Sequence, residues 1–240
     1  MNKFGYIKTL FTTLVLLILS VSLINFIIDS EKIFKINNTS SEAEKFVIQM
    51  TNSKEPIFNI FDITRREIKK NLAISSTKKA CAIVGSSRIW ELKSNILSQS
   101  FRDLCPSLIN LGLPGGSIED IFIFSEILLN NPSSPNKIII EIAPWTFNFG
   151  RDSRWIQDRN LFYKIYNKLG DENKYFVEEE IEKKYILKLA SNLFNKDYLM
   201  SSLNILYKNF KAKFFTKKKI NYYSLDSFNN EGANIYSHKF

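Results

Sequence analysis

The first hydrophobic pattern along the chain is one uninterrupted run near the N-terminus. Residues Leu10–Ile28 contain no ionisable side chain and are dominated by Leu, Ile, Val and Phe. A helix of about 19 such residues is long enough to cross the hydrocarbon layer of a membrane. Lys3 and Lys8 precede the run, whereas Asp29 and Glu31 follow it. This distribution predicts a single-pass protein of the cell membrane, with its N-terminus in the cytosol and its bulk extracytoplasmic.

A cleaved signal peptide is the alternative interpretation of this run. Ser20 and Ser22 are small residues of the kind found at cleavage sites. The apolar run continues past Ser22 to Ile28, broken only by the uncharged Asn25. This continuation favours an uncleaved transmembrane anchor over residues 1–30.

Apolar positions recur at helical spacing between the anchor and residue 79. After a polar spacer over residues 29–40, Ser41 and Glu44 form a capping-box pattern that predicts a helix start. A second helix is predicted after Pro56. Its expected apolar face consists of Ile57, Phe61, Ile68 and Leu72, and its largely opposite polar face of Arg65, Arg66, Lys69 and Lys70. We expect residues 31–79 to form membrane-proximal packing helices.

Short continuous apolar runs replace the helical spacing at residue 80. The run Ala80–Val84 predicts a buried strand of a parallel sheet, and Ser107–Leu111 and Lys137–Ile142 predict a second and a third strand. Helices are predicted between them, from about Ser87 to Ser98 and from Ser117 onward. This alternation indicates an α/β core over residues 80–147, a three-layer open parallel sheet with right-handed crossovers.

Helical spacing returns after residue 147. Amphipathic helices are predicted over Trp155–Leu169, Tyr175–Leu193 and Tyr198–Phe215, and only Ile220–Leu225 is strand-like. We interpret residues 148–240 as a helical insertion or lid followed by an incomplete C-terminal part.

Composition and charge narrow the class of protein. The 240 residues are 45% hydrophobic and 14% aromatic, which is enough for the core of a medium-sized domain and excludes a disordered chain. The net charge of +9 includes a run of lysines: Lys211, Lys213, Lys217, Lys218 and Lys219. Because an exported domain rarely meets nucleic acid, we expect membrane lipid or an acidic envelope polymer as partners. A solvated helix end is the simpler alternative.

The two cysteines leave two interpretations open. Cys81 opens the first predicted strand and Cys105 stands just before the second. If these strands are parallel neighbours, both cysteines lie at the same end of the sheet and can form a disulfide. Two buried thiols are the alternative.

The candidate site lies in three loops, because open parallel sheets bind ligands at the carboxyl ends of their strands. Gly85-Ser86-Ser87-Arg88 follows the first strand and places a hydroxyl at a helix start. Gly112-Leu113-Pro114-Gly115-Gly116 follows the second, and its glycines allow close approach to a substrate. Ala143-Pro144-Trp145-Thr146 follows the third. A plain helix N-cap is the alternative interpretation of the first loop.

This succession of loops, over Cys81–Phe147, resembles the SGNH or GDSL-type hydrolase superfamily. Within it, the chain is similar to membrane-anchored envelope proteins of teichoic-acid D-alanylation and exopolysaccharide O-acylation. The resemblance implies that Ser87 is the nucleophile, with its own amide and that of Gly115 as oxyanion donors. We take Arg88, Asn110 and Trp145 as substrate-binding candidates, and expect no metal or cofactor.

The chain departs from this family at two points. Ala143-Pro144-Trp145-Thr146 stands where the family has Gly-x-Asn-Asp, so the oxyanion asparagine is absent, although the anchored relatives also carry a Pro and an aromatic residue there. The family needs an Asp and a His about three residues apart near the C-terminus. Here the only histidine is His238, preceded at that spacing by Ile235, while Glu231 and Asp226 stand too early.

Two explanations account for the missing triad. The chain is either a truncated reading frame that lacks the last strands, or a complete non-catalytic module. The resemblance implies a role in acyl transfer or ester hydrolysis on envelope polysaccharide, as a serine-dependent O-acyltransferase or esterase. It also implies the polysaccharide or an acyl-donor membrane protein as a partner, and no nucleic acid. The alternative function is a non-enzymatic polysaccharide-binding or assembly protein.

Overall fold

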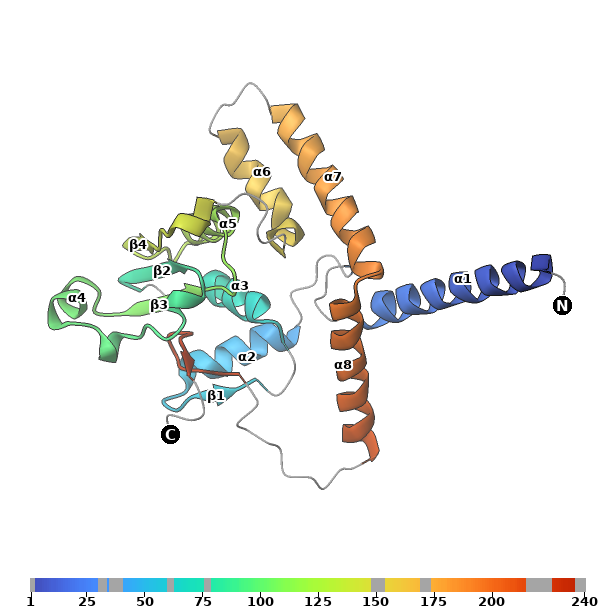
Figure 1. Cartoon of the computed structure of the whole chain (residues 1–240). Helices are drawn as coiled ribbons and strands as arrows, with labels where there is room; N and C mark the ends of the chain where they lie inside the picture. Colours follow the sequence, from blue (N-terminus) through green and yellow to red (C-terminus); the bar gives the residue numbers. More distant parts are fainter. Residues whose placement is uncertain are drawn as a thin grey trace. The chain divides into compact units, whose positions relative to one another are not determined.

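The computed structural model describes residues 3–29, 34, 41–59, 63–75, 79–147, 154–168, 174–214 and 226–235. The chain divides into two compact units. The first comprises residues 1–37 and 175–219, and the second comprises residues 38–174 and 220–240 (Figure 1). The first unit is helical, and the second contains the sheet.

Three helices form the described part of the first unit. They are α1 (Lys3–Ile28), α7 (Lys174–Leu193) and α8 (Lys196–Phe214). Within α1, Gly5–Ile28 has a mean hydropathy of 2.5 and is almost entirely exposed. The prediction of one N-terminal apolar helix, long enough to cross a membrane, is therefore confirmed, as are the positions of the two later helices.

The C-terminal end of α1 is bonded to the junction between α7 and α8. The Asn25 Nδ2 donates hydrogen bonds to the carbonyl oxygens of Asn192 (3.2 Å) and Leu193 (3.1 Å). These carbonyls lie at the end of α7, where a helix leaves its last carbonyls without intrahelical donors. The Tyr198 hydroxyl of α8 donates to Asp29 Oδ1 at 2.6 Å. Both polar residues of the α1 end are buried.

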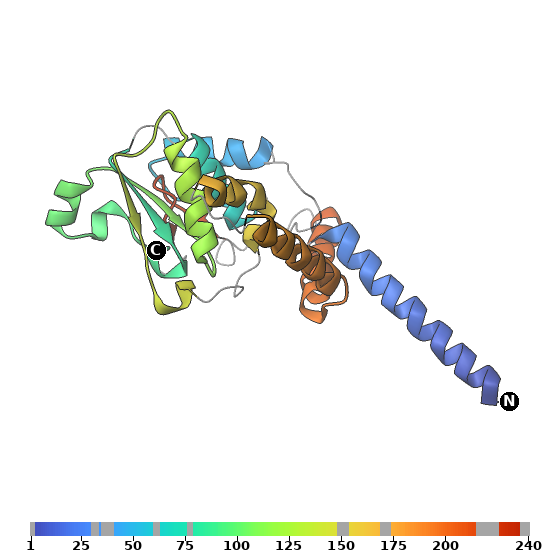
Figure 2. The same ribbon diagram turned by 90° about the horizontal axis from the view of Figure 1, so that it is seen from above.

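The second unit contains the predicted parallel sheet. Its strands are β2 (Cys81–Gly85), β3 (Leu108–Gly112) and β4 (Lys137–Ile140), in the order β3-β2-β4. Both pairings are parallel, with Cys81 opposite Leu108 on one side and Lys137 on the other. Helix α3 (Arg65–Ser75) packs against β3, and α5 (Ile118–Leu129) against β2 (Figure 2). The predicted start of α5 is confirmed, since Ser117 and Asp120 form a capping box.

The helix predicted from Ser87 to Ser98 is wrong. This segment forms two 3-10 turns, Ser87–Ile89 and Ser94–Ile96, and the α-helix that follows, α4, covers only Gln99–Leu104. The Asn110 side chain donates to the carbonyl oxygens of Ile89 and Leu92, which a helix would have used itself. Hydrogen bonds from the Asn110 side chain of β3 therefore take the place of the bonds that an α-helix would form within this segment.

The region before the sheet agrees with the sequence pattern only in part. Helix α2 (Ser41–Asn52) begins where predicted. After Pro56, however, Ile57–Phe58 form the short strand β1, which pairs with β5 (Ser227–Phe228), and β5 pairs with β6 (Asn234–Ile235). Helix α3 starts only at Arg65.

The predicted polar face of α3 is also wrong, because two of its cations point into the protein. Arg66 and Lys69 are buried. The guanidinium of Arg66 forms a salt bridge with the buried Asp120 of the α5 capping box. The Lys69 ammonium group donates hydrogen bonds to the backbone carbonyl oxygens of Asn110 and Gly232. The spacing of polar residues along α3 does not predict either set of partners.

The remaining predicted elements lie partly outside the described residues. The helix expected over 155–169 is a 3-10 turn, Arg154–Asp158, followed by α6 (Arg159–Lys168). The strand-like segment 220–225 and the lysines at 217–219 fall outside the described ranges.

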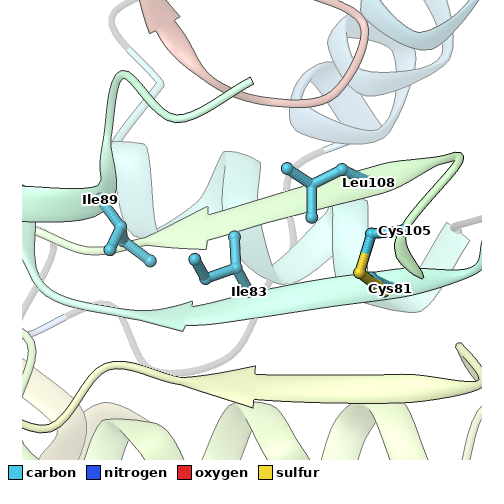
Figure 3. Packing of buried hydrophobic residues seen from close by; sticks show 5 residues of the cluster. All are labelled: Cys81, Ile83, Ile89, Cys105 and Leu108. Atoms are coloured by element: carbon cyan, nitrogen blue, oxygen red, sulfur yellow. A yellow bond between two sulfur atoms is a disulfide. The ribbon is translucent and has the colours of Figure 1, made fainter. Parts of the chain in front are cut away.

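Cys81 and Cys105 form a disulfide, which decides between the two interpretations of these residues. Their Cα atoms lie 5.4 Å apart. The bridge joins the start of β2 to the segment before β3 and packs with Ile83, Ile89 and Leu108 in a buried cluster (Figure 3). Because disulfides are typical of oxidising compartments, this bond indicates that the sheet lies outside the cytosol.

Lys69 fastens the C-terminal hairpin to the outer edge of β3. Its ammonium group donates to the carbonyl oxygens of Asn110 (2.7 Å) and Gly232, while the Asn110 amide donates to the Glu231 carbonyl at 2.7 Å. The Lys69 side chain is completely buried. Desolvation by burial, with a smaller contribution from the charge of Arg65, lowers the pKa of Lys69 to about 7.

This lowered pKa predicts a specific pH dependence of stability. An unfolded lysine titrates near 10.5, so between about pH 7 and 10.5 the unfolded chain binds one more proton than the folded chain. The free energy of unfolding should therefore rise with pH across this window, by on the order of 1 kcal/mol per pH unit. Chemical unfolding of the detergent-solubilised chain, followed by near-UV circular dichroism, measures the slope.

The Lys69→Met variant should lose this slope, because its side chain carries no titrating group. Lys70→Met is the matched control, since Lys70 lies next to Lys69 on α3 and pairs with Asp158 of the Arg154–Asp158 turn. Equal slopes in the wild type and Lys69→Met would contradict the prediction.

Candidate functional site

The loops after β2 and β3 meet at the carboxyl edge of the sheet, as the topology predicts. The Leu113 amide donates to the Gly85 carbonyl oxygen at 2.9 Å. A Cβ added at Gly116 would lie 2.7 Å from that same oxygen and 3.3 Å from the Ser86 Cα. Only a glycine permits this close approach of the two backbones.

The two adjacent serines of the first loop have different environments. Ser86 is buried, and its hydroxyl oxygen caps the 3-10 turn by accepting a hydrogen bond from the Arg88 amide at 3.4 Å. Ser87 is exposed at the first position of that turn. The structural role of an N-cap therefore falls to Ser86, and Ser87 presents its hydroxyl at the surface.

Glu141 is a residue of this edge that the sequence analysis did not single out. It follows β4, and its Oε2 accepts hydrogen bonds from the Ser86 amide (2.6 Å) and the Ser86 hydroxyl (2.8 Å). A Cβ at Gly85 would lie 2.5 Å from the Glu141 Cβ. The available signal was a carboxylate inside the apolar run Ile138–Ile142, at the carboxyl end of a predicted parallel strand, where ligands and loop contacts gather.

Arg88 and Trp145, predicted separately as substrate-binding residues, are in contact. The Arg88 guanidinium carbon lies 3.8 Å from the centroid of the Trp145 ring, a cation–π arrangement. The turn that carries Trp145 is held by Thr146, whose hydroxyl oxygen accepts from the Ala143 amide at 3.0 Å. The pair joins the loops after β2 and β4 and places a cation beside Ser87.

Gly115 and Asn110 have different positions relative to the surface. Gly115 is exposed in the turn after β3 at a φ of +63°, a conformation that favours glycine. The turn is held by Arg154, which donates to the Pro114 carbonyl oxygen at 2.6 Å. Asn110 is completely buried, and its side chain bonds to the backbone of Ile89, Leu92 and Gly112. We therefore assign Asn110 a structural role.

The described part of this edge shows no carboxylate or imidazole bonded to the Ser87 hydroxyl. The nearby carboxylate of Glu141 bonds to Ser86 rather than to Ser87. His238 lies outside the described residues. Among the described residues, no group of three or more His, Cys, Asp or Glu side chains is placed to hold a metal ion.

We compared the chain with known protein families, curated proteins and solved structures. The chain matches no protein-family model, no curated protein and no solved structure.

The contact between Glu141 and Ser86 predicts the effect of two substitutions. Glu141→Ala leaves a buried amide and hydroxyl without an acceptor and should lower the free energy of unfolding by about 1–3 kcal/mol. Gly85→Ala should have a similar effect, because its methyl group displaces the Glu141 side chain. Thermal unfolding measures both. Asp103→Ala removes an exposed carboxylate from α4 and is the control; a Glu141→Ala variant as stable as this control would contradict the assignment.

Proposed function

We propose that this chain is a membrane-anchored, extracytoplasmic SGNH-like protein that binds acyl esters of an envelope polysaccharide. The observation that carries the proposal is the exposed Ser87 at the carboxyl edge of a parallel sheet. It stands next to the Arg88–Trp145 pair and on the loop that Gly116 packs against. Three short loops that are remote in sequence thus contribute to one candidate ester-binding site.

Each part has a chemical role in the proposed site. Ser87 occupies the nucleophile position, and the amides of Ser87 and Gly115 would bind the carbonyl oxygen of the ester. The flat surface of Trp145 suits a sugar ring. Arg88 provides an exposed cation for a carboxylate or phosphate of the polymer.

Ester transfer or hydrolysis at the same site is the second candidate, and Glu141 favours binding without catalysis over it. A serine hydroxyl is a weak nucleophile at neutral pH unless an adjacent base activates it. The Glu141 carboxylate accepts hydrogen bonds from the amide and the hydroxyl of Ser86 and thereby fixes the loop after β2. We therefore propose ester binding without turnover for the 240 residues, as a relative of acyltransferases and esterases with an incomplete triad.

The proposed anchor and location rest on α1 and on the disulfide. A signal sequence can share the length and composition of α1. Here the helix continues unbroken to Ile28, and Asn25 and Asp29 join its end to the helices of the same unit. The disulfide fits a domain outside the cytosol. Together they support an uncleaved anchor with its N-terminus in the cytosol.

The topology can be tested with a fused reporter. Because α1 should cross the membrane once, a reporter enzyme that is active only outside the cytosol should be active when fused after Phe240. The fusion should remain in the membrane fraction after salt and carbonate washes. An inactive reporter, or a fusion released by carbonate, would contradict the proposed location.

The site can be tested by two measurements on one set of variants. The full chain in detergent should retain O-acylated polysaccharide better than the same polymer after alkaline deacylation. Arg88→Ala and Trp145→Ala should weaken retention of the acylated polymer, because these side chains are assigned to its sugar ring and its anionic groups, whereas Ser100→Ala, a change at another exposed serine, should not. A serine-directed fluorophosphonate should label the wild type no faster than Ser87→Ala, because none of the described side chains is placed as a base for the hydroxyl.

The outcomes separate the two candidate functions. Strong labelling that depends on Ser87 would show that a base is present and that the chain is a working enzyme. Equal retention of both polymers would contradict ester binding at this site.

A further inference from the structure

Helix α8 carries an exposed apolar stripe. Five large apolar side chains are between 39% and 62% exposed: Met200, Leu203, Leu206, Tyr207 and Phe210. Their spacing of three and four residues places them on one side of the helix. Asp197, Ser201 and Asn204 are exposed on another side. The helix is thus amphipathic, with its apolar side open to the surroundings.

The position of α8 within its unit suggests what surrounds this stripe. Figure 1 shows α8 running across the C-terminal end of α1, and both helices belong to the same compact unit. Tyr198, on the α8 side that holds the buried Ser202, bonds to Asp29 at the end of α1. If α1 crosses a membrane, α8 lies at the level where α1 leaves it.

The orientation of the stripe agrees with this level. At about 100° per residue, the stripe is centred roughly a third of a turn from the side that contains Tyr198 and Ser202. A helix that lies flat beside the end of α1 can therefore direct its stripe to the membrane. Asp197, Ser201 and Asn204 then face water.

The charge of the following segment suits the same surface. The sequence contains lysines at positions 208, 211 and 213 within α8 and at 217–219 after it. Clusters of four to eight Lys or Arg residues beside an amphipathic helix favour anionic lipid headgroups. Lipid is therefore a better match for this face than another protein surface.

We propose that α8 is an interfacial helix that lies in the outer surface of the membrane crossed by α1. Its apolar stripe would enter the boundary between headgroups and acyl chains. The inference rests on the proposed anchor and goes beyond it, because it assigns a second membrane contact to a segment about 170 residues later in the chain.

Site-directed spin labelling of the full chain tests the proposal. Both native cysteines are in the disulfide, so an introduced cysteine can be labelled alone. The labelled positions are Leu203→Cys and Leu206→Cys on the stripe, and Ser201→Cys and Asn204→Cys as matched controls on the polar side. The chain is reconstituted in vesicles of phosphatidylethanolamine and phosphatidylglycerol. Collision rates with oxygen and with a water-soluble nickel complex report the depth of each label.

The stripe labels should lie about 5–10 Å below the headgroup boundary, with high oxygen and low nickel accessibility, and the control labels should lie in water. Equal nickel accessibility on both sides of α8 would overturn the proposal. Shielding of the stripe labels from both reagents would also overturn it, because it would indicate a protein partner or a second copy. Two stripe positions guard against a local effect of one label.

A label at Leu16→Cys, in the middle of α1, separates this proposal from the anchor itself. Immersion of Leu16→Cys without immersion of Leu203→Cys would leave the anchor intact and reject the interfacial helix. A Leu16→Cys label in water would reject the anchor.

Discussion

The second unit depends on one buried amide, that of Asn110 in β3. Its side chain donates to the carbonyl groups of Ile89 and Leu92 and accepts from the Gly112 amide. Its backbone amide donates to Glu231, and its carbonyl oxygen accepts from Lys69. The loop after β2, the edge strand and the C-terminal hairpin are therefore fixed by the same residue. Because its polar atoms are buried, the loss of any of these partners would leave a costly unpaired group.

The arrangement of the candidate site follows from this constraint. Asn110 takes the carbonyl groups that a helix after β2 would have used, so the chain makes a short 3-10 turn there. The turn exposes Ser87 and Arg88, while Glu141, just after the neighbouring strand β4, accepts hydrogen bonds from Ser86. Arg88 then reaches Trp145. The site is thus rigid on its buried side and exposed on the side where a ligand would bind.

Local patterns predicted the parts of the fold that local physics determines. The three strands are continuous apolar runs, and the start of α5 has a capping residue and an acid at the correct spacing, so both could be located from the sequence. The turn after β2, the burial of Arg66 and Lys69, and the role of Glu141 could not. Each depends on a partner more than 20 residues away: Asn110, Asp120, Gly232 and Ser86. A helical pattern shows which residues are polar, but not whether a distant carbonyl or carboxylate will accept their hydrogen bonds.

Asn25 illustrates the same limit in the first unit. In the sequence it is only an uncharged interruption of an apolar run. In the structure its amide satisfies carbonyl groups at the end of α7, and the neighbouring Asp29 accepts from α8. An amide in hydrocarbon is costly without such partners, so under the proposed anchor Asn25 and its partners belong to the end of α1 that leaves the apolar layer. The helices bonded there would then be held at the membrane boundary, where an amphipathic helix gains stability by placing its apolar side in the lipid.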